Sequence, residues 1–129
     1  MGQQQLLLIV LGVIIVGIAV VVGINVFTAS SLQANIDGLT ADVVNLGSMA
    51  QQYHRKPTAL GGGGNSFVGW SIPAALDTTG NGVYSITSTA AAKIVIKGVG
   101  NEIGADGTNG VNVTATVTPT GIKTAVGNN

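Results

Sequence analysis

The pattern of apolar and polar positions divides the chain into parts with different periodicities. From Leu6 to Ile24 every residue is apolar or Gly. In an α-helix, which rises about 1.5 Å per residue, a run of this length crosses a hydrocarbon core of about 30 Å. The run therefore predicts a helix that lies in lipid or among other hydrophobic helices.

A second apolar pattern follows Phe27 and has the period of an amphipathic helix. Its members recur at alternating steps of four and three residues, which places them on one stripe. They are Leu32, Ile36, Leu39, Val43, Leu46, Met49 and Tyr53. The sequence contains no Pro before Pro57, so we predict one long helix over residues 1–56. Residues 6–27 form its membrane or filament-core half, residues 28–56 form its amphipathic half, and we expect the stripe to pack on a sheet.

The remaining sequence predicts a small β-rich head. Pro57 and the Gly61–Gly64 tract end the helix, and residues 57–65 are interpreted as a flexible Gly-rich connector. Residues 66–129 form the head. Short runs with strand-like composition or alternation predict strands near residues 65–70, 82–88, 93–97, 111–118 and 122–126. The predicted fold class is α+β, with a long hydrophobic-then-amphipathic N-terminal helix and a small antiparallel sheet.

Composition and charge argue against several classes of function. Only 8% of the residues are charged, the formal net charge is +0, and Cys is absent. We therefore expect no nucleic-acid binding, because a surface that tracks phosphates needs clustered Lys and Arg. The sequence also shows no catalytic constellation, so we expect no enzymatic activity, no catalytic residue and no cofactor.

Three candidate features have simpler structural interpretations than metal binding. The loops at residues 77–82 and 106–110 are rich in Asp, Asn and Gly but supply few carboxylates, so we predict turns. His54 is the only histidine and stands beside Arg55 and Lys56. At the end of a helix these side chains are expected to complement the helix dipole rather than to bind a metal.

The N-terminal apolar run has three possible identities. A removable signal peptide is disfavoured because residues 1–5 carry no Lys or Arg and the run is longer than a typical hydrophobic region of such a peptide. A single-span anchor would belong to a non-polymerising membrane-anchored surface or binding protein. The third identity is a helix that begins in the membrane and ends inside a protein filament, and we favour it because an amphipathic half and a β head follow.

This order of parts, together with the opening Met-Gly-Gln-Gln-Gln-Leu-Leu-Leu, resembles the type IV pilin-like family, which includes the pseudopilins. The resemblance implies a structural subunit of an extracellular filament at the cell surface, with an inner-membrane-inserted precursor. It implies a homo-oligomeric helical filament, an assembly motor, and a leader peptidase that would cut between Gly2 and Gln3.

The resemblance also implies roles for residues in the apolar half. The filament-core packing residues would be Leu6, Leu7, Leu8, Ile9, Leu11, Gly12, Ile14, Ile15, Gly17, Ile18, Val21 and Gly23. Where the family usually carries an acidic residue near the mature N-terminus, this chain has Gln3, Gln4 and Gln5. Because buried amides need hydrogen-bond partners, we expect these three residues to make neutral polar contacts at the filament axis.

Overall fold

The computed structural model describes residues 2–128 and has an α+β fold, as predicted. Its elements are α1 (Gly2–Arg55), the short 3₁₀-helix η1 (Thr58–Leu60) and strands β1 (Gly82–Thr89), β2 (Ile94–Ile103), β3 (Gly110–Thr118) and β4 (Gly121–Gly127). The chain divides between Ser31 and Leu32 into two compact units. The second unit holds the last part of α1, the connecting segment and the whole sheet, and is called the head below.

The first unit is helical throughout its described residues, 2–31. Its side chains are exposed up to Ser30. By length and composition, the apolar part of α1 near the N-terminus is able to cross a membrane.

The sheet of the head is an antiparallel meander in which every strand pairs with its neighbour in sequence, in the order β1-β2-β3-β4. Strand β3 shows why the sequence folds this way. Its alternate residues Val111, Val113, Ala115 and Val117 are fully buried, whereas the residues between them are half-buried. This period of two gives the sheet one apolar face and one polar face.

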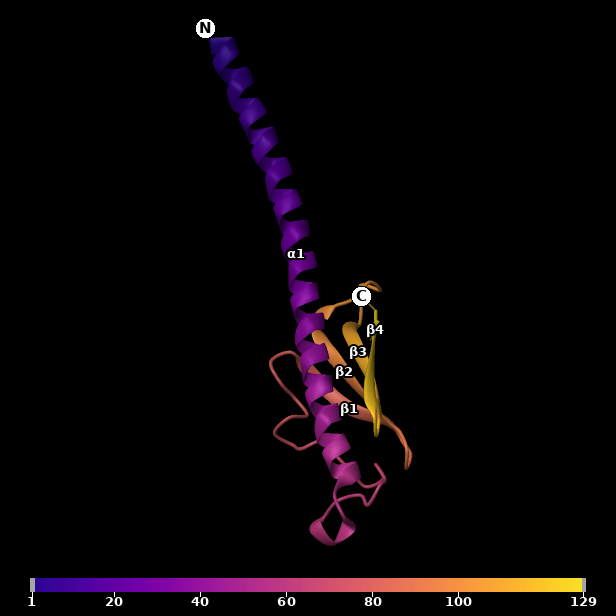
Figure 1. Ribbon diagram of the computed structural model, residues 1–129. Coiled ribbons are helices and arrows are strands. Elements are labelled where there is room, and N and C mark those ends of the chain that lie inside the picture. The colour runs from indigo at the N-terminus through magenta and orange to yellow at the C-terminus, as the bar shows by residue number, and fades with distance from the viewer. Residues whose placement is uncertain (1, 129) are drawn as a thin grey trace. The chain divides into compact units, whose positions relative to one another are not determined.

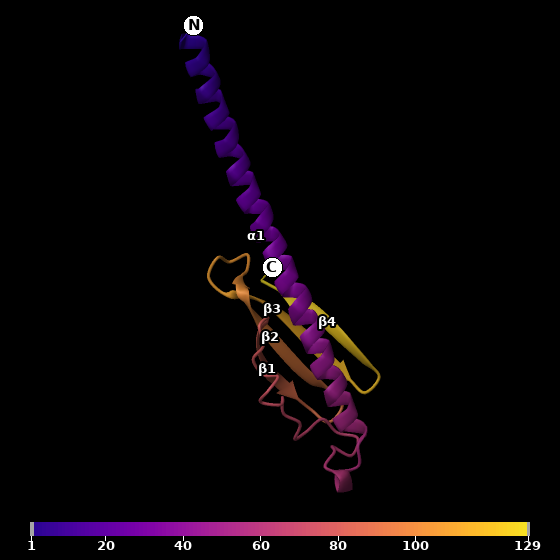
Figure 2. The same ribbon diagram turned by 90° about the vertical axis from the view of Figure 1, so that its left-hand side faces the viewer.

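Residues 32–55 of α1 cover the apolar face of the sheet (Figures 1 and 2). The helix approaches closely where side chains are small. A Cβ atom added to Gly47 would stand 2.9 Å from the Cγ2 of Val117, and one added to Gly98 would stand 3.4 Å from the Cδ2 of Leu39. The helix and the sheet therefore close one hydrophobic core between them.

The glycine tract after the helix is a hydrogen-bonded cap rather than a free connector. The amides of Gly63, Gly64 and Asn65 donate to the carbonyls of Tyr53, Lys56 and His54 at 2.8, 3.0 and 2.7 Å. These bonds satisfy carbonyl groups that the end of a helix leaves without partners.

The tract needs glycine for steric reasons. A Cβ atom at Gly63 would lie 1.8 Å from the carbonyl oxygen of Ser66, and Gly61 and Gly64 have φ angles of 85° and 58°. The expectation of a flexible connector therefore gives way to a compact turn, because the composition alone does not reveal these contacts.

The predicted strand at residues 65–70 is wrong. Asn65 and Gly69 adopt φ angles of 66° and 92°, which lie outside the β region, and Trp70 donates its amide to the carbonyl of Phe67 at 3.2 Å. This segment forms turns, and it places the Phe67 side chain in the core, fully buried. The other four predicted strands correspond to β1–β4.

Candidate functional site

The most unusual surface of the protein is the N-terminal part of α1, where exposed apolar side chains surround the helix. The large apolar side chains from Leu6 to Phe27 each expose between 53% and 73% of their surface. We call these side chains the apolar helix surface. In the head, by contrast, Leu39, Val43 and Ile96 are fully buried. Soluble monomers rarely expose a contiguous apolar surface of this extent, so it marks a contact with lipid or with protein.

The structure places the predicted filament-core residues on this one helical segment. The three glycines among them, Gly12, Gly17 and Gly23, have open space around them, since a Cβ atom built at each meets nothing within 4 Å. Gly12 and Gly23 are separated by about three helical turns and share a face, whereas Gly17 points elsewhere. The fold of the chain itself therefore does not require glycine at these positions.

The polar residues at the start of α1 are exposed as well. Gln3, Gln4 and Gln5 lie in the helix with their side chains exposed, and Gly2 is the first residue of α1. Met1, the other residue of the proposed leader, lies outside the described residues. The axial contacts and the cleavage between Gly2 and Gln3 remain predictions.

The seven residues of the amphipathic stripe lie at different depths in the head. Ile36, Leu39, Val43 and Leu46 are buried in the core, and Leu32 and Met49 pack against it half-buried. Tyr53 is half-buried and donates its hydroxyl to the carbonyl of Val68 at 3.0 Å.

Three residues outside the predicted stripe lie on the same buried side of the helix. Gly47, Ala50 and His54 are buried there too. The signal was available, because Gly47 and Ala50 follow the stripe residues Val43 and Leu46 by four positions, and His54 follows Ala50 by four, which places them on the same side of the helix.

His54 is buried at the end of α1 rather than exposed there. Its ring stacks on Phe67 with the ring centroids 4.6 Å apart, and its Nδ1 atom finds no hydrogen-bond partner among the described residues. Phe67 covers His54 at the end of α1, and the expected contribution of His54 and its basic neighbours to the helix dipole stays a prediction. Across residues 2–128, no group of three or more His, Cys, Asp or Glu side chains is placed to hold a metal ion.

A polar cluster joins α1 to the loop before β1. The Oδ2 atom of Asp42 accepts hydrogen bonds from Oγ1 of Thr79 and Nδ2 of Asn81, both at 3.0 Å, and from the hydroxyl of Tyr84. Nearby, Nδ2 of Asn35 donates to the carbonyl of Asn81 at 2.7 Å. The predicted turn at residues 77–82 is thus fixed to the helix by side-chain hydrogen bonds.

The environment of this cluster shifts two pKa values. Burial raises the pKa of the Asp42 carboxyl, but the hydrogen bonds from Asn81, Tyr84 and Thr79 favour the carboxylate, and the net pKa lies below its usual value. Burial and the hydrogen bond to Asp42 raise the pKa of the Tyr84 hydroxyl. Asp42 therefore stays ionised and Tyr84 stays neutral, which is the pair of states that the hydrogen bond needs.

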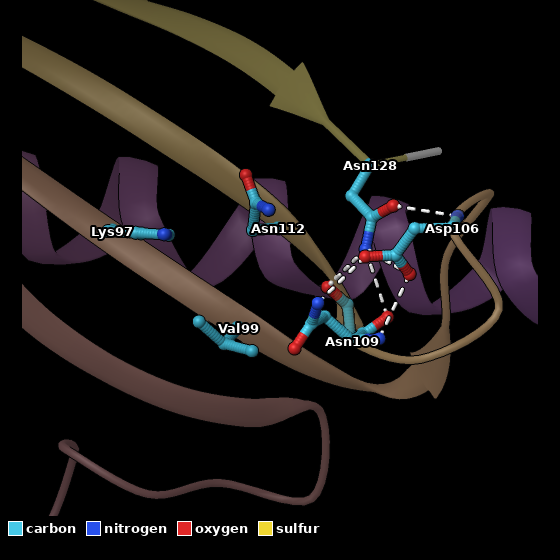
Figure 3. Close-up of a pocket in the computed structure, with 7 residues that line it drawn as sticks. Lys97, Val99, Asp106, Asn109, Asn112 and Asn128 are labelled. Atoms are coloured by element: carbon cyan, nitrogen blue, oxygen red, sulfur yellow. Dashed lines mark hydrogen bonds between the residues drawn. The ribbon is translucent and has the colours of Figure 1, made fainter.

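A second polar cluster lies at the tip of the β2–β3 hairpin (Figure 3). Asp106 accepts the amides of Thr108 and Asn109 at 3.0 and 2.9 Å, and Nδ2 of Asn128 donates to Oδ1 of Asp106 at 3.2 Å and to the carbonyl of Asn109 at 2.9 Å. The backbone bonds from Thr108 and the bonds from Asn109 lower the pKa of the Asp106 carboxyl. These bonds fix the hairpin to the segment after β4.

An open depression of about 510 Å³ adjoins this second cluster. Its lining residues are Lys97, Val99, Asp106, Asn109, Gly110, Asn112 and Asn128. Most hydrogen-bonding atoms of Asp106 and Asn128 are used by the contacts that hold the hairpin, as the dashed lines in Figure 3 show. These contacts give the second polar cluster a structural role. The apolar helix surface therefore remains the candidate functional site.

Comparison of the chain with protein-family models, with curated proteins and with solved structures finds no match. The function is therefore inferred from the geometry of the residues described above.

Proposed function

We propose that this protein is a structural subunit of an extracellular type IV pilin-like filament that polymerises through its apolar helix surface. One observation carries the proposal: the large apolar side chains from Leu6 to Phe27 are all exposed, while the head closes its own core. The head needs no further partner for its stability, whereas the helix does.

Energetics support a membrane-inserted precursor. Removing a large aliphatic side chain from water contributes about 1.5–3 kcal/mol, so the whole surface favours a non-aqueous environment by tens of kcal/mol. Before assembly the inner membrane supplies that environment. A transfer free energy of this size is incompatible with a soluble monomer that keeps this helix in water.

The free energy of transferring the helix from the membrane to the filament is close to zero. Lipid tails are as apolar as Leu, so helices associate in place of lipid contacts through close packing rather than through the hydrophobic effect. The open surroundings of Gly12, Gly17 and Gly23 leave room for the backbone of another copy to approach. An external assembly motor would supply the work of extraction.

The three glutamines provide the polar contacts of the filament axis in this proposal. Each unsatisfied buried polar group costs about 1–3 kcal/mol, so Gln3, Gln4 and Gln5 would bond to neighbouring backbones or to one another once they are buried. They take the place of the charged pair that an acidic residue would form with a terminal amine.

Material sheared from the surface of the producing cells tests the proposal. Electron microscopy should show long filaments, and mass spectrometry should find this chain in them with residues 6–27 intact and Gln3 or Met1 at the N-terminus. If the chain appears only in detergent extracts of the membrane, without filaments, it is a non-polymerising single-span surface protein and the proposal fails.

A further inference from the structure

The charged residues of the head are separated by sign along its length. The chain has five acidic and five basic residues, which lie between Asp37 and Lys123 and therefore all belong to the head. We define the acidic end as the end of the head where α1 enters at Leu32. The basic end is the opposite end, where α1 stops at Arg55.

The acidic residues lie toward the end of the head that Leu32 occupies. Asn35, one turn after Leu32, accepts the amide of Glu102 at 3.3 Å, so Glu102 lies at the level of this turn. Asp37 is on the same part of the helix, and Asp106 is in the hairpin that follows Ile103, the last residue of β2. Asp42 and Asp77 lie near the middle of the head, since both contact Tyr84, which pairs with Gly98 beside Lys97.

The basic residues lie toward the other end. Nη2 of Arg55 donates to the carbonyl of Pro119, in the β3–β4 turn, at 3.0 Å, and Lys56 is the next residue. Lys93 directly precedes Ile94, which pairs with Val117 close to this turn. Figures 1 and 2 show the β1–β2 and β3–β4 turns at the same end of the sheet.

Two lysines complete the gradient. Lys123 pairs with Thr116 and so lies in the basic half of the sheet. Lys97 pairs with Ser85 and Thr114, near the middle of the strands. The head thus carries an electrostatic dipole along its length although its formal net charge is zero.

We infer that consecutive copies of this chain meet through these ends, with the acidic end of one head facing the basic end of the next. The inference rests on the proposed function, and it adds the surface that sets the polarity and register of the filament. Apolar helix packing has little directional preference, and the glutamines carry no charge. The partner is a second copy, because the two ends of one head are complementary to each other.

The charge arrangement also selects the type of contact. Two heads that met through equal ends would bring like charges together, which is unfavourable. A contact between unlike ends is heterologous, leaves one free end at each side and propagates into an open helical assembly. The same dipole therefore disfavours closed symmetric dimers and favours filaments.

Charge reversal at either end tests the inference in the full-length chain in its producing cells. The variant Asp37→Lys/Glu102→Lys makes both ends basic, and the variant Lys56→Glu/Lys93→Glu makes both ends acidic. The variant Lys97→Glu is the control, because Lys97 lies near the middle of the strands on the outer face of the sheet and belongs to neither end. Filament yield is measured relative to the amount of membrane-inserted precursor.

We expect each end variant alone to lose filaments by about tenfold or more, because every junction then joins like charges. Production of both end variants in one cell should restore the yield to within about twofold of the unchanged chain, with the two variants alternating. The outer-face control should also remain within about twofold.

Three results would overturn the inference. Normal filaments from either end variant alone, or no recovery when both are present, would overturn it while leaving the proposed function in place. Absence of filaments from the unchanged chain would overturn the proposed function and this inference with it. Rescue by mixing also excludes a folding defect as the cause of lost filaments.

Discussion

The Oδ2 atom of Asp42 on α1 lies 3.0 Å from the Nδ2 atom of Asn81 in the loop before β1. This hydrogen bond depends on Gly38, because a Cβ atom at that position would stand 2.5 Å from the Oδ1 atom of Asn81. A helix position without a side chain thus lets a distant loop reach the half-buried Asp42. The polar cluster, as well as the apolar stripe, therefore determines how the loop docks on the helix.

Replacing Asp42 by Asn should destabilise the head by about 1–3 kcal/mol. The amide has one fewer acceptor site than the carboxylate and brings donors of its own toward Thr79, Asn81 and Tyr84. Thermal unfolding followed by the fluorescence of Trp70, the single tryptophan of the chain, measures the change. The full chain in detergent micelles is the appropriate sample.

The same substitution at Asp37 is the matched control. Asp37 is exposed and accepts one side-chain hydrogen bond, from Gln33 at 3.0 Å. Asp37→Asn should therefore cost at most about 0.5 kcal/mol. Equal losses of stability for Asp42→Asn and Asp37→Asn would contradict the role assigned to the cluster.

Acid should weaken the head through the same carboxylate. The pKa of Asp42 is lower in the folded protein than the ordinary value of 3.8, so folding favours the ionised form. This contribution to stability is complete well above pH 4 and is lost as the pH falls below 4 through the pKa of the folded state. Unfolding measured between pH 2 and pH 7 should show the loss, and Asp42→Asn should show a shallower one. An identical pH profile for the two chains would show that Asp42 does not contribute.

His54 should be replaceable by Phe without loss of stability. Its Nδ1 atom is buried without a partner among residues 2–128, and its ring packs on Phe67, an interaction that a phenyl ring can preserve. We expect His54→Phe to change the free energy of unfolding by between zero and about 1 kcal/mol in the stabilising direction. His54→Ala, which removes the packing, should destabilise. A loss of more than about 1 kcal/mol for His54→Phe would indicate that Nδ1 has a partner in solution.

Larger residues at Gly12 and Gly23 should impair assembly without impairing insertion. The described chain has space at both positions, so Leu is compatible with the helix and adds apolar surface for the membrane. In a filament with close helix contacts, overpacking of about 1–3 kcal/mol per contact should reduce the filament yield by tenfold or more. Val16→Leu and Val22→Leu are the controls. Normal filaments from Gly12→Leu/Gly23→Leu would show that these glycines are not contact points.

Periodicity explains which parts of the fold could be predicted. The steps of four and three from Leu32 predicted the buried side of α1, and the alternation in residues 111–118 predicted β3, because both signals are local. The segment at residues 65–70 has a strand-like composition, but its positive φ angles follow from contacts with the helix end and could not be predicted from the sequence.

The polar clusters were beyond prediction for a related reason. Asp42 and Asn81 are far apart in sequence, and only the docking of the loop brings them together. The apolar helix surface, in contrast, could be predicted almost completely, because an uninterrupted run from Leu6 to Ile24 is incompatible with exposure to water in any fold.

A helical reconstruction of the sheared filaments by electron cryomicroscopy is the most direct test of the central claim. The account predicts that residues 6–27 of successive copies pack together at the filament axis, with Gln3, Gln4 and Gln5 hydrogen-bonded and the heads outside. A reconstruction in which the heads alone make the contacts and residues 6–27 lie away from the axis would contradict it.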